Sequence, residues 1–334
     1  MATVIDVVRE TDTTVSVVFA TAQPLPYRPG QYVQTVFRLG RGRYRRSYSL
    51  SSVPADDHAS ITVKHVPGGK VSQYITSQLA IGDRFLVSAA RGDFVLPDSR
   101  AGRRFVFVAG GSGIAPVMSL VRTLLAMPAP VPVHLLYYTR NGDDIIFRAR
   151  LEELADIHPQ LDLRLSVTGP RAGWTGAHQP FAIEQVLDAA RDDPQALFYL
   201  CGPESLIDAA RDGLAAAGVA PARVFMERFA TAPGKERPAQ GQPATFISRG
   251  LLFQRRTRVR TRPGESLLDA AERAGLKVSS NCRNGTCGRC RAKLLDGEVA
   301  MDEPNSLTLA DAQAGRVLTC VSYAAAPVVV DLRH

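Results

Sequence analysis

The chain has 334 residues, a formal net charge of +8 and a hydrophobic fraction of 45%. At roughly 100 to 200 residues per domain, this length predicts two or three domains, and the composition is typical of a globular protein. No run of residues approaches the ~20 apolar positions of a membrane span. The basic excess does not indicate nucleic-acid binding, because the arginines are scattered among 32 acidic residues and no nucleic-acid-binding motif accompanies them.

Residues 1–100 contain short β-rich runs that are interrupted by Pro and Gly. Clear examples are 14–19, 32–37 and 60–64. Runs of this length and spacing predict an antiparallel β-barrel. We therefore expect the first domain to be built mainly from strands.

One polar segment of this domain, at a strand end, could hold a nucleotide cofactor. Alternation along the strand places Arg46 and Tyr48 on one face, with Ser47 and Ser49 opposite. A cation for a phosphate and an aromatic ring for stacking are what a flavin nucleotide requires. Taken singly, the segment is better explained as a polar strand end.

A second polar segment begins a predicted helix over 71–79. It consists of Gly69, Lys70, Val71 and Ser72. A helix N-terminus beside a lysine is a candidate phosphate site, because free N–H groups and a cation both attract an anion. Taken singly, this segment too is better explained as a capped helix.

Residues 101–230 alternate between strand-like runs and helical patterns. The runs are 105–108, 133–138, 163–167 and 196–200. This alternation is typical of a parallel, doubly wound α/β sheet. A glycine-rich turn joins the first run to its helix, and Gly111 and Gly113 would let the backbone approach a pyrophosphate at the helix N-terminus.

This turn favours a dinucleotide but departs from the ordinary Rossmann fingerprint. Pro116 stands where the third glycine of that fingerprint would be, and no acidic residue is obvious at the ribose position. A related but different nucleotide site is implied.

The remaining chain separates into a linker and a third domain. Residues 231–243 hold three prolines and two glycines with few apolar side chains, which predicts a flexible linker. In 244–334, two strand-like runs flank 261–265, a helix over 266–275 ends at Gly275, and a cysteine-rich loop and a final strand follow. This order predicts a β-grasp domain.

Four cysteines of this domain, Cys282, Cys287, Cys290 and Cys320, have the spacing C-x4-C-x2-C-x29-C. This is the spacing of plant-type 2Fe-2S ferredoxins. Gly285 and Gly288 allow the positive φ angles that turn amide groups toward sulfur. A four-thiolate zinc site fits less well, because zinc ligands usually come as two C-x2-4-C pairs.

Disulfides are the other alternative for these cysteines. They are disfavoured, because 1–6 show neither the basic nor the apolar region of an export signal. We therefore expect reduced thiols and a cytoplasmic location.

Basic residues are in excess in the third domain, with 14 Lys plus Arg against 9 Asp plus Glu from 244 to 334. Arg283, Arg289, Arg291 and Lys293 lie in or beside the cysteine loop. A basic rim would steer an electron-accepting protein with an acidic surface. A merely solvated basic surface explains the same residues equally well.

Taken together, these motifs resemble the ferredoxin-NADP reductase family, in particular its oxygenase-type reductases with a C-terminal plant-type 2Fe-2S domain. Such reductases serve phenylacetyl-CoA oxygenase, ketosteroid hydroxylase and hybrid-cluster protein. The resemblance covers essentially the whole chain in the same domain order. The matching segments are the R-x-Y-S motif at 46–49, the G-x-G-x-x-P motif at 111–116, the C-G-P motif at 201–203 and the domain-closing segment 227–229.

The resemblance implies roles for individual residues. Arg46 would bind a flavin phosphate, Tyr48 would stack on the isoalloxazine and Ser49 would lie near the hydride-accepting nitrogen. The segments 48–54 and 69–72 look like those of FAD-binding members, so FAD is favoured over FMN. The candidate catalytic residues are Ser49, Cys201 and Glu227.

The same resemblance places Gly111, Gly113 and Pro116 in the nicotinamide-nucleotide site. Cys201 would approach the nicotinamide, and Phe229 would lie near the flavin. From the residues alone, Cys201 is explained about as well as a small buried hydrophobic residue. Arg140 and Arg171 could contact the 2′-phosphate of NADPH or be ordinary surface cations, so the choice between NADH and NADPH stays open.

The expected function is electron transfer from NAD(P)H through FAD and a 2Fe-2S cluster to a partner oxygenase, hydroxylase or desaturase. A flavin accepts a hydride and releases single electrons, whereas a cluster carries one electron at a time. Oxygen activation would belong to the partner, because no Rieske or 2-His-1-carboxylate ligand set is evident in the sequence. The alternatives are a redox sensor without rapid turnover and a stand-alone diaphorase.

Overall fold

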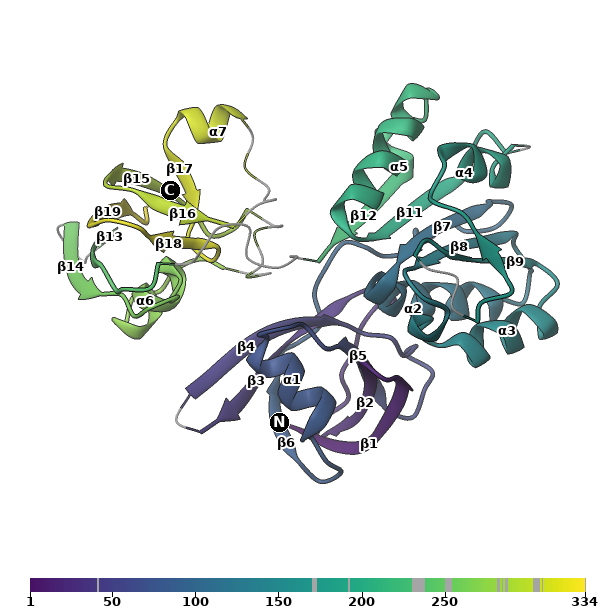
Figure 1. The fold of residues 1–334 in the computed structure, drawn as a ribbon, viewed down its shortest axis with the longest axis horizontal. Helices are drawn as coiled ribbons and strands as arrows, with labels where there is room; N and C mark the ends of the chain where they lie inside the picture. The colour runs from purple at the N-terminus through teal and green to yellow at the C-terminus, as the bar shows by residue number, and fades with distance from the viewer. Residues whose placement is uncertain are drawn as a thin grey trace. The chain divides into compact units, whose positions relative to one another are not determined.

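The computed structural model describes residues 1–40, 42–169, 173–191, 193–229, 238–249, 254–280, 283, 285, 288–302, 307 and 309–333. The chain divides into two compact units, Met1–Phe229 and Ala230–His334. Their elements are labelled in Figure 1. Of the predicted linker 231–243, residues 231–237 lie outside the described residues.

The first part of the first unit is an antiparallel sheet with the strand order β4-β3-β6-β1-β2-β5. Its strands are β1 (Ala2–Thr11), β2 (Thr14–Thr21), β3 (Tyr32–Leu39), β4 (Gly42–Ser49), β5 (Ala59–Lys64) and β6 (Arg84–Val87). A bridge between Leu50 and Ile61 joins the end of β4 to β5, so the sheet closes on itself. This confirms the predicted antiparallel barrel.

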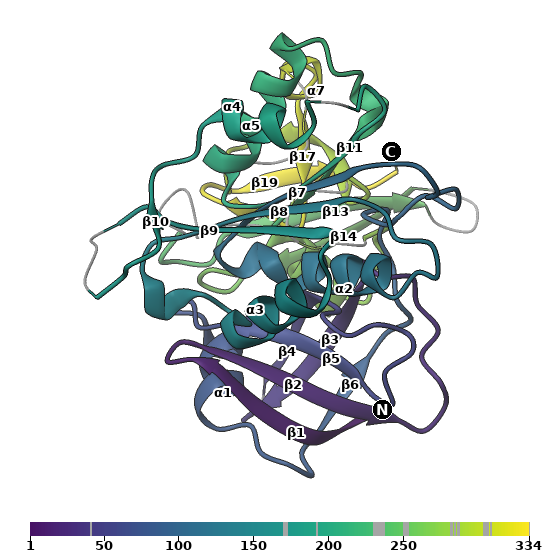
Figure 2. The same cartoon turned by 90° about the vertical axis from the view of Figure 1, so that its right-hand side faces the viewer.

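Apolar side chains at alternate strand positions fill the inside of this barrel. Val15, Val17 and Phe19 of β2 are at most 1% exposed. Helix α1 (Lys70–Ser77) packs against the same core through Val71 and Ile75, which lie one turn apart on one helix face. Figure 2 shows α1 against the strands of the barrel.

The rest of the first unit is a parallel sheet with the strand order β10-β9-β8-β7-β11-β12. Its strands are β7 (Phe105–Gly110), β8 (Val133–Thr139), β9 (Leu161–Val167), β10 (Ala177–His178), β11 (Leu197–Gly202) and β12 (Val224–Arg228). Short 3-10 turns are η1 (Gly111–Gly113), η2 (Gly142–Asp144) and η3 (Pro221–Arg223). The predicted doubly wound sheet is confirmed.

Helices cover both faces of this sheet (Figure 2). Helices α2 (Ile114–Leu125) and α3 (Arg148–Ile157) pack on one face, and α4 (Ile183–Ala189) and α5 (Glu204–Ala216) pack on the other. Both faces of the central strands are therefore buried, which explains their nearly continuous apolar sequences. Since β7 has β8 on one side and β11 on the other, the direction of winding changes at β7, and ligands bind at such points in α/β sheets.

The second unit contains a mixed sheet with the strand order β14-β13-β19-β15-β17 and a separate antiparallel pair, β16 with β18. Its elements are β13 (Pro243–Arg249), β14 (Gln254–Arg260), α6 (Leu267–Arg273), β15 (Arg291–Asp296), β16 (Val299–Met301), α7 (Leu309–Gln313), β17 (Arg316–Leu318), β18 (Ser322–Ala324) and β19 (Val328–Asp331). Helix α6 packs on the sheet through Leu267, Ala270 and Ala271. The β-grasp prediction is confirmed.

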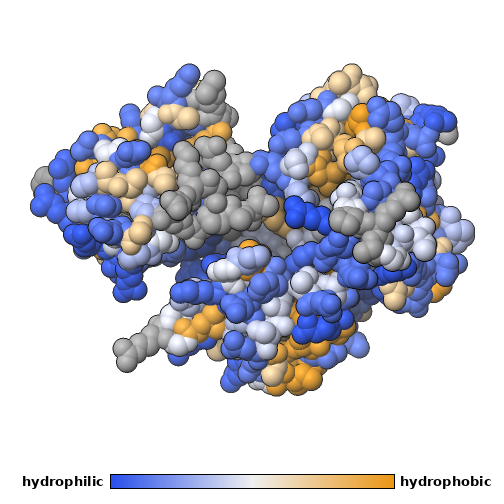
Figure 3. All heavy atoms as spheres, in the orientation of Figure 1, coloured by the Kyte–Doolittle hydropathy of each residue, from blue (hydrophilic) through white to orange (hydrophobic). Residues whose placement is uncertain are grey.

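The surface is consistent with the ordinary composition of the chain. Hydrophilic residues cover most of the face shown in Figure 3. Among the described residues, no helix has the length and apolar character that crossing a membrane requires.

Candidate functional site

The end of β4 presents the predicted flavin-binding side chains. Pairing with β3 places Arg46 opposite Thr35 and Tyr48 opposite Val33. Arg46 is exposed, whereas burial raises the pKa of Tyr48 against the opposing effect of the Arg46 charge. The phenol is therefore neutral at physiological pH, as an aromatic stacking surface should be.

The two predicted phosphate sites lie next to each other. The Lys70 ammonium at the start of α1 is 5.8 Å from the centre of the Tyr44 ring. Tyr44 precedes Arg46 by two residues on β4, so its side chain belongs to the same strand face. The structure thus brings the cations of two segments to one side of the barrel.

The other predicted residues of this segment have structural roles. Val71 lies in the barrel core. The Ser72 hydroxyl donates to the Gly69 carbonyl at 3.0 Å and accepts the Val66 N–H at 3.1 Å. These bonds close the turn that leads into α1 and leave Lys70 exposed at its start.

The three candidate catalytic residues converge from both parts of the first unit. The Ser49 hydroxyl donates to a Glu227 carboxylate oxygen at 3.3 Å. Cys201 on β11 is the register partner of Glu227 on β12 and is fully buried. The structure therefore brings Ser49, Cys201 and Glu227 close together.

Burial controls the ionisation of Glu227 and Cys201. Glu227 as a residue is half-buried, but its carboxyl group is surrounded by protein, and desolvation raises its pKa to about 8 although Ser49 donates a hydrogen bond to it. Desolvation, with a smaller effect of Glu227, also raises the pKa of the Cys201 thiol. A carboxyl group with a pKa near neutrality can hold or release a proton at physiological pH.

The glycine-rich turn meets the end of β11 at close range. Gly111 has φ of +51°, a conformation that favours glycine. A Cβ on Gly113 would lie 2.2 Å from the Cys201 carbonyl oxygen. Only glycine allows this approach, which joins the turn before α2 to the strand end that carries Cys201. Pro116 is in the first turn of α2, where a missing N–H costs no helical hydrogen bond.

Phe229 follows β12 and packs against the core that α2 and α3 share with the parallel sheet. Its neighbour Arg228 forms ion pairs with Glu204 at 3.1 Å and with Asp208 at 2.6 Å, both on α5. These pairs hold the segment that carries Glu227 and Phe229. Arg140 is exposed after the end of β8, and Arg171 lies outside the described residues.

The predicted cluster ligands are partly visible in the second unit. Cys282 and Cys287 lie outside the described residues. Cys290 and Cys320 are both buried, and their sulfur atoms are 3.2 Å apart, well beyond the ~2.05 Å of a disulfide. The Thr319 N–H and hydroxyl both donate to the Cys290 carbonyl at 3.1 Å, which holds the two cysteines together.

The described loop residues fit a cluster as well. Gly285 and Gly288 have positive φ angles of 82° and 67°, as the sequence predicts. Arg283 forms ion pairs with Asp269 at 3.1 Å and with Glu272, both on α6. The loop is thus tied to α6. Two adjacent unbridged thiols suit the thiolate ligation that iron-sulfur clusters use.

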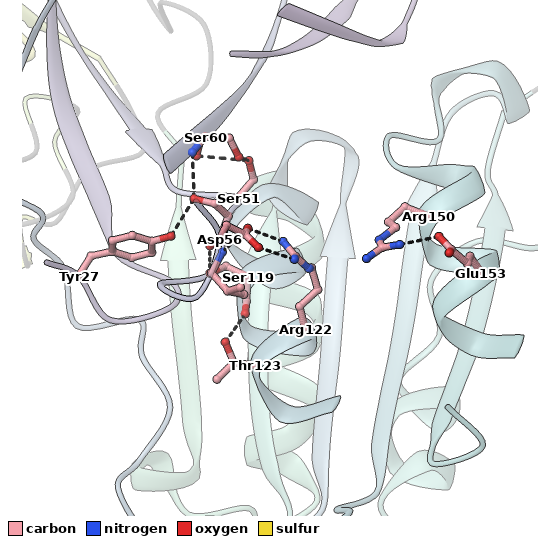
Figure 4. Close-up of polar contacts among 11 residues, drawn as sticks. Tyr27, Ser51, Asp56, Ser60, Ser119, Arg122, Thr123, Arg150 and Glu153 are labelled. Atoms are coloured by element: carbon pink, nitrogen blue, oxygen red, sulfur yellow. Dashed lines mark hydrogen bonds and ion pairs between the residues drawn. The ribbon is translucent and has the colours of Figure 1, made fainter. Parts of the chain in front are cut away.

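Sequence reasoning missed a polar contact between the barrel and α2. Arg122 of α2 forms two hydrogen bonds of 2.7 Å with Asp56 (Figure 4). Ser119 of the same helix donates to the Ser52 carbonyl at 2.5 Å. A signal was present, because Arg122 is the one charged residue in an otherwise largely apolar helix.

Known protein families match three segments of the chain. The Oxidoreductase FAD-binding domain matches residues 2–96, the Oxidoreductase NAD-binding domain matches 107–212, and the 2Fe-2S iron-sulfur cluster binding domain matches 253–325.

Similar curated proteins match almost the full length. The chain is 30% identical to one of the subunits of 1,2-phenylacetyl-CoA epoxidase of Escherichia coli (strain K12), over 98% of this chain and 96% of the relative. It is 33% identical to the ferredoxin reductase component of 3-ketosteroid-9-alpha-monooxygenase of Mycobacterium tuberculosis, over 95% and 91%.

Two solved structures are also similar. Phthalate dioxygenase reductase has 25% sequence identity and a TM-score of 0.81, over 99% of this chain and 97% of that chain. The cytochrome P450 reductase GcoB of Amycolatopsis has 29% identity and a TM-score of 0.61, over 68% of each chain.

Proposed function

We propose that this chain, which belongs to the family of FAD- and NAD-binding oxidoreductases with a 2Fe-2S domain, is an electron-delivering reductase. It would deliver electrons from NADH or NADPH to a partner oxygenase, hydroxylase or desaturase. The family resemblance, the fold class and the cofactor set that the sequence predicts are borne out by the matches to three cofactor-binding domains and to full-length reductases. The observation that supports the proposal best is the contact of Ser49 with Glu227, because it joins the flavin domain to the nicotinamide domain.

The protein residues at the flavin site have separate tasks in this proposal. Arg46 and Lys70 would neutralise the phosphates of FAD, and Tyr48 would offer its ring for stacking. Bound FAD supplies the capacity to take up a hydride and to release electrons singly. Arg46 and Lys70 are both exposed and lie near one face of β4, so they are available to a ligand.

The nicotinamide nucleotide would bind where β7 and β11 end. Gly111 and Gly113 shape the turn at the start of α2, and the N-terminus of a helix favours a pyrophosphate. Cys201 lies against the same turn and would limit the space for the nicotinamide. Phe229 follows β12 at the end of the first unit and would lie near the flavin.

Ser49 and Glu227 would manage a proton in this site. At pH 7 the Glu227 carboxyl is mostly protonated, because its pKa is about 8. The protonated carboxyl and the Ser49 hydroxyl can exchange hydrogen-bond direction without placing a charge in a buried space. This arrangement would hold a proton near the hydride-accepting end of the flavin.

The cysteines of the second unit would hold the 2Fe-2S cluster. Cys290 and Cys320 are placed side by side, and Cys282 and Cys287 complete the predicted ligand set. Thiolate ligation requires reduced cysteines, which supports a cytoplasmic location. The choice between NADH and NADPH stays open. Of the two candidate cations, Arg140 is among the described residues and Arg171 lies outside them.

We further propose that the acceptor has an acidic surface. The four loop cations are not equivalent, because Arg283 and Arg291 already pair with acidic residues of the same unit. Arg289 and Lys293 are exposed and are better candidates for an external partner. Electrostatic attraction of this kind mainly raises the association rate and weakens with salt.

The proposal is tested by comparing two acceptors with the full-length protein and its Cys287→Ala variant. Ferricyanide can take electrons from the flavin, whereas delivery to cytochrome c should depend on the cluster. The variant should retain NAD(P)H-dependent ferricyanide reduction and lose cytochrome c reduction. Loss of both activities in a folded, flavin-loaded variant would contradict a linear relay, and absence of rapid turnover in the unmodified protein would favour a redox sensor.

A further inference from the structure

The barrel and the nicotinamide domain of the first unit meet through a polar contact that the proposed relay does not use. Arg122 on α2 donates from both terminal nitrogens to the two carboxylate oxygens of Asp56, at 2.7 Å each. Asp56 belongs to the loop that follows the flavin motif on β4. Figure 4 shows the two side chains pointing toward each other from these elements. A bidentate pair fixes orientation as well as distance.

The Asp56 carboxylate is prepared for this contact. It accepts the Val53 N–H at 3.0 Å, and the Asp56 N–H donates to the Val53 carbonyl at 3.0 Å, so the turn orients the side chain. Burial opposes its ionisation, but the hydrogen bonds from Arg122 and Val53 outweigh that effect and lower its pKa. The two side chains are 24% and 29% exposed, which leaves the pair only partly screened by solvent.

A second hydrogen bond, from Ser119 to Ser52, lies beside this pair. Ser119 is fully buried and precedes Arg122 by three positions, so both side chains project from one face of α2. Its hydroxyl donates to the Ser52 carbonyl at 2.5 Å. The Ser52 hydroxyl in turn contacts the Tyr27 hydroxyl at 2.8 Å and accepts the Ser60 N–H at 2.9 Å. The loop is therefore fixed to the barrel and to α2 at once.

The elements joined in this way carry the two halves of the proposed hydride path. Ser52 follows Tyr48 and Ser49 by only a few residues, and α2 begins at the turn that contains Gly111 and Gly113. The loop from Ser49 to Asp56 is short, and α2 is a regular helix, so a shift at the contact would move one half against the other. A second ion pair, Lys64 of β5 with Asp144 of η2 at 3.3 Å, joins the same two domains elsewhere.

We propose that Asp56 and Arg122 are positioning residues for hydride transfer, which set the distance between the flavin-binding end of β4 and the nicotinamide-binding turn. This inference rests on the proposed function and adds residues outside the segments that it assigns to either cofactor. Hydride transfer is sensitive to such placement, because an error of about 1 Å can cost on the order of 100-fold in rate. A pair that only stabilised the fold would not affect the transfer step selectively.

The test uses the full-length, flavin-loaded protein and its Arg122→Gln, Arg122→Lys and Asp56→Asn variants. Stopped-flow absorbance under anaerobic conditions measures flavin reduction at increasing concentrations of NADH or NADPH. Arg122→Gln and Asp56→Asn should lower the limiting rate at least tenfold, with little change in nucleotide dissociation constant, flavin content or reduction by dithionite. The Arg122→Lys variant keeps the charge but loses the bidentate geometry of the guanidinium group. Its limiting rate should lie between those of the other two variants and that of the unmodified protein.

Two further measurements separate positioning from stability. Arg164→Gln is the matched control, because Arg164 pairs with Asp162 at 2.8 Å within the nicotinamide domain alone. The control should reduce its flavin within twofold of the unmodified rate, even if its melting temperature falls equally. In the positioning variants, deuteration of the transferred hydrogen should give a larger isotope effect, because transfer becomes slower than the steps around it.

The result that would overturn the inference is a limiting rate within twofold of the unmodified protein in Asp56→Asn and Arg122→Lys. An equal rate loss in Arg164→Gln would overturn it too, since the effect would then follow stability. Failure of the unmodified, flavin-loaded protein to be reduced by either nucleotide would instead contradict the proposed function. If Arg122→Gln does not fold, the two milder variants decide the question.

Discussion

The Ser49 hydroxyl on β4 donates a hydrogen bond to the Glu227 carboxylate on β12 at 3.3 Å, although 178 positions separate the two residues in the chain. Ser49 ends the flavin motif of the barrel, and Glu227 lies beside Cys201 at the edge of the parallel sheet. The bond places a carboxyl group with a pKa of about 8 at the junction of the two domains.

Glu227→Gln should slow flavin reduction about 100-fold or more at pH 7, because proton handling by a positioned side chain typically contributes about 10²-fold or more. The pH profile of the limiting rate should lose a transition near pH 8 that the unmodified protein shows. Stopped-flow absorbance over pH 6 to about 9 measures both effects. Glu184→Gln, at an exposed carboxylate of α4, is the control and should leave rate and profile unchanged.

The same carboxyl group affects stability. Its pKa is raised from 4.5 to about 8 on folding, so between these values the folded protein holds a proton that the unfolded chain releases. The contribution of Glu227 to the free energy of unfolding is therefore greatest at low pH and declines as pH rises through this window. The melting-temperature difference between the unmodified protein and Glu227→Gln should follow that trend, and a difference independent of pH would contradict it.

Arg46→Ala should weaken FAD binding about tenfold or more, because a phosphate would lose a charge-assisted hydrogen bond. Fluorescence titration of the flavin-free protein measures the dissociation constant. Arg43→Ala is a close control, since Arg43 is also an arginine of β4 but occupies the opposite strand parity. Equal losses for the two variants would indicate a general charge effect instead of a phosphate contact.

Gly113→Ala should displace the nicotinamide-binding turn, because the new methyl group would lie 2.2 Å from the Cys201 carbonyl oxygen. NAD(P)H affinity, measured by titration of the flavin-loaded protein, should fall while flavin content is retained. Gly218→Ala controls for a simple conformational cost. Gly218 has φ of +77° and open space around it, so its substitution should cost about 1–2 kcal/mol of stability and no nucleotide affinity.

The sequence predicted what local patterns determine. Strand alternation correctly placed Arg46 and Tyr48 together, and the alternation of strands and helices over 101–230 indicated the doubly wound sheet. The positive φ angles at Gly285 and Gly288 followed from the need of the loop to turn around sulfur. In each case neighbouring residues carry the information.

Contacts between distant segments could not be predicted from local sequence patterns. Nothing near Lys70 in the sequence indicates that it approaches Tyr44, and the pairing of Asp56 with Arg122 depends on how two domains pack. The family resemblance singled out Ser49 and Glu227 as candidate catalytic residues, but their contact was known only from the structure, because no local pattern relates them. The elevated pKa of Glu227 also required the structure, since it is a consequence of burial.

The central claim is that electrons pass from NAD(P)H through the flavin to a cluster held by Cys282, Cys287, Cys290 and Cys320. Low-temperature electron paramagnetic resonance of the full-length, cofactor-loaded protein tests it, with samples frozen at intervals after anaerobic addition of NADH or NADPH. We expect the signal of a reduced 2Fe-2S cluster to appear after flavin absorbance begins to fall, and to be absent in Cys287→Ala. Full flavin reduction without any cluster signal in the unmodified protein would contradict the account.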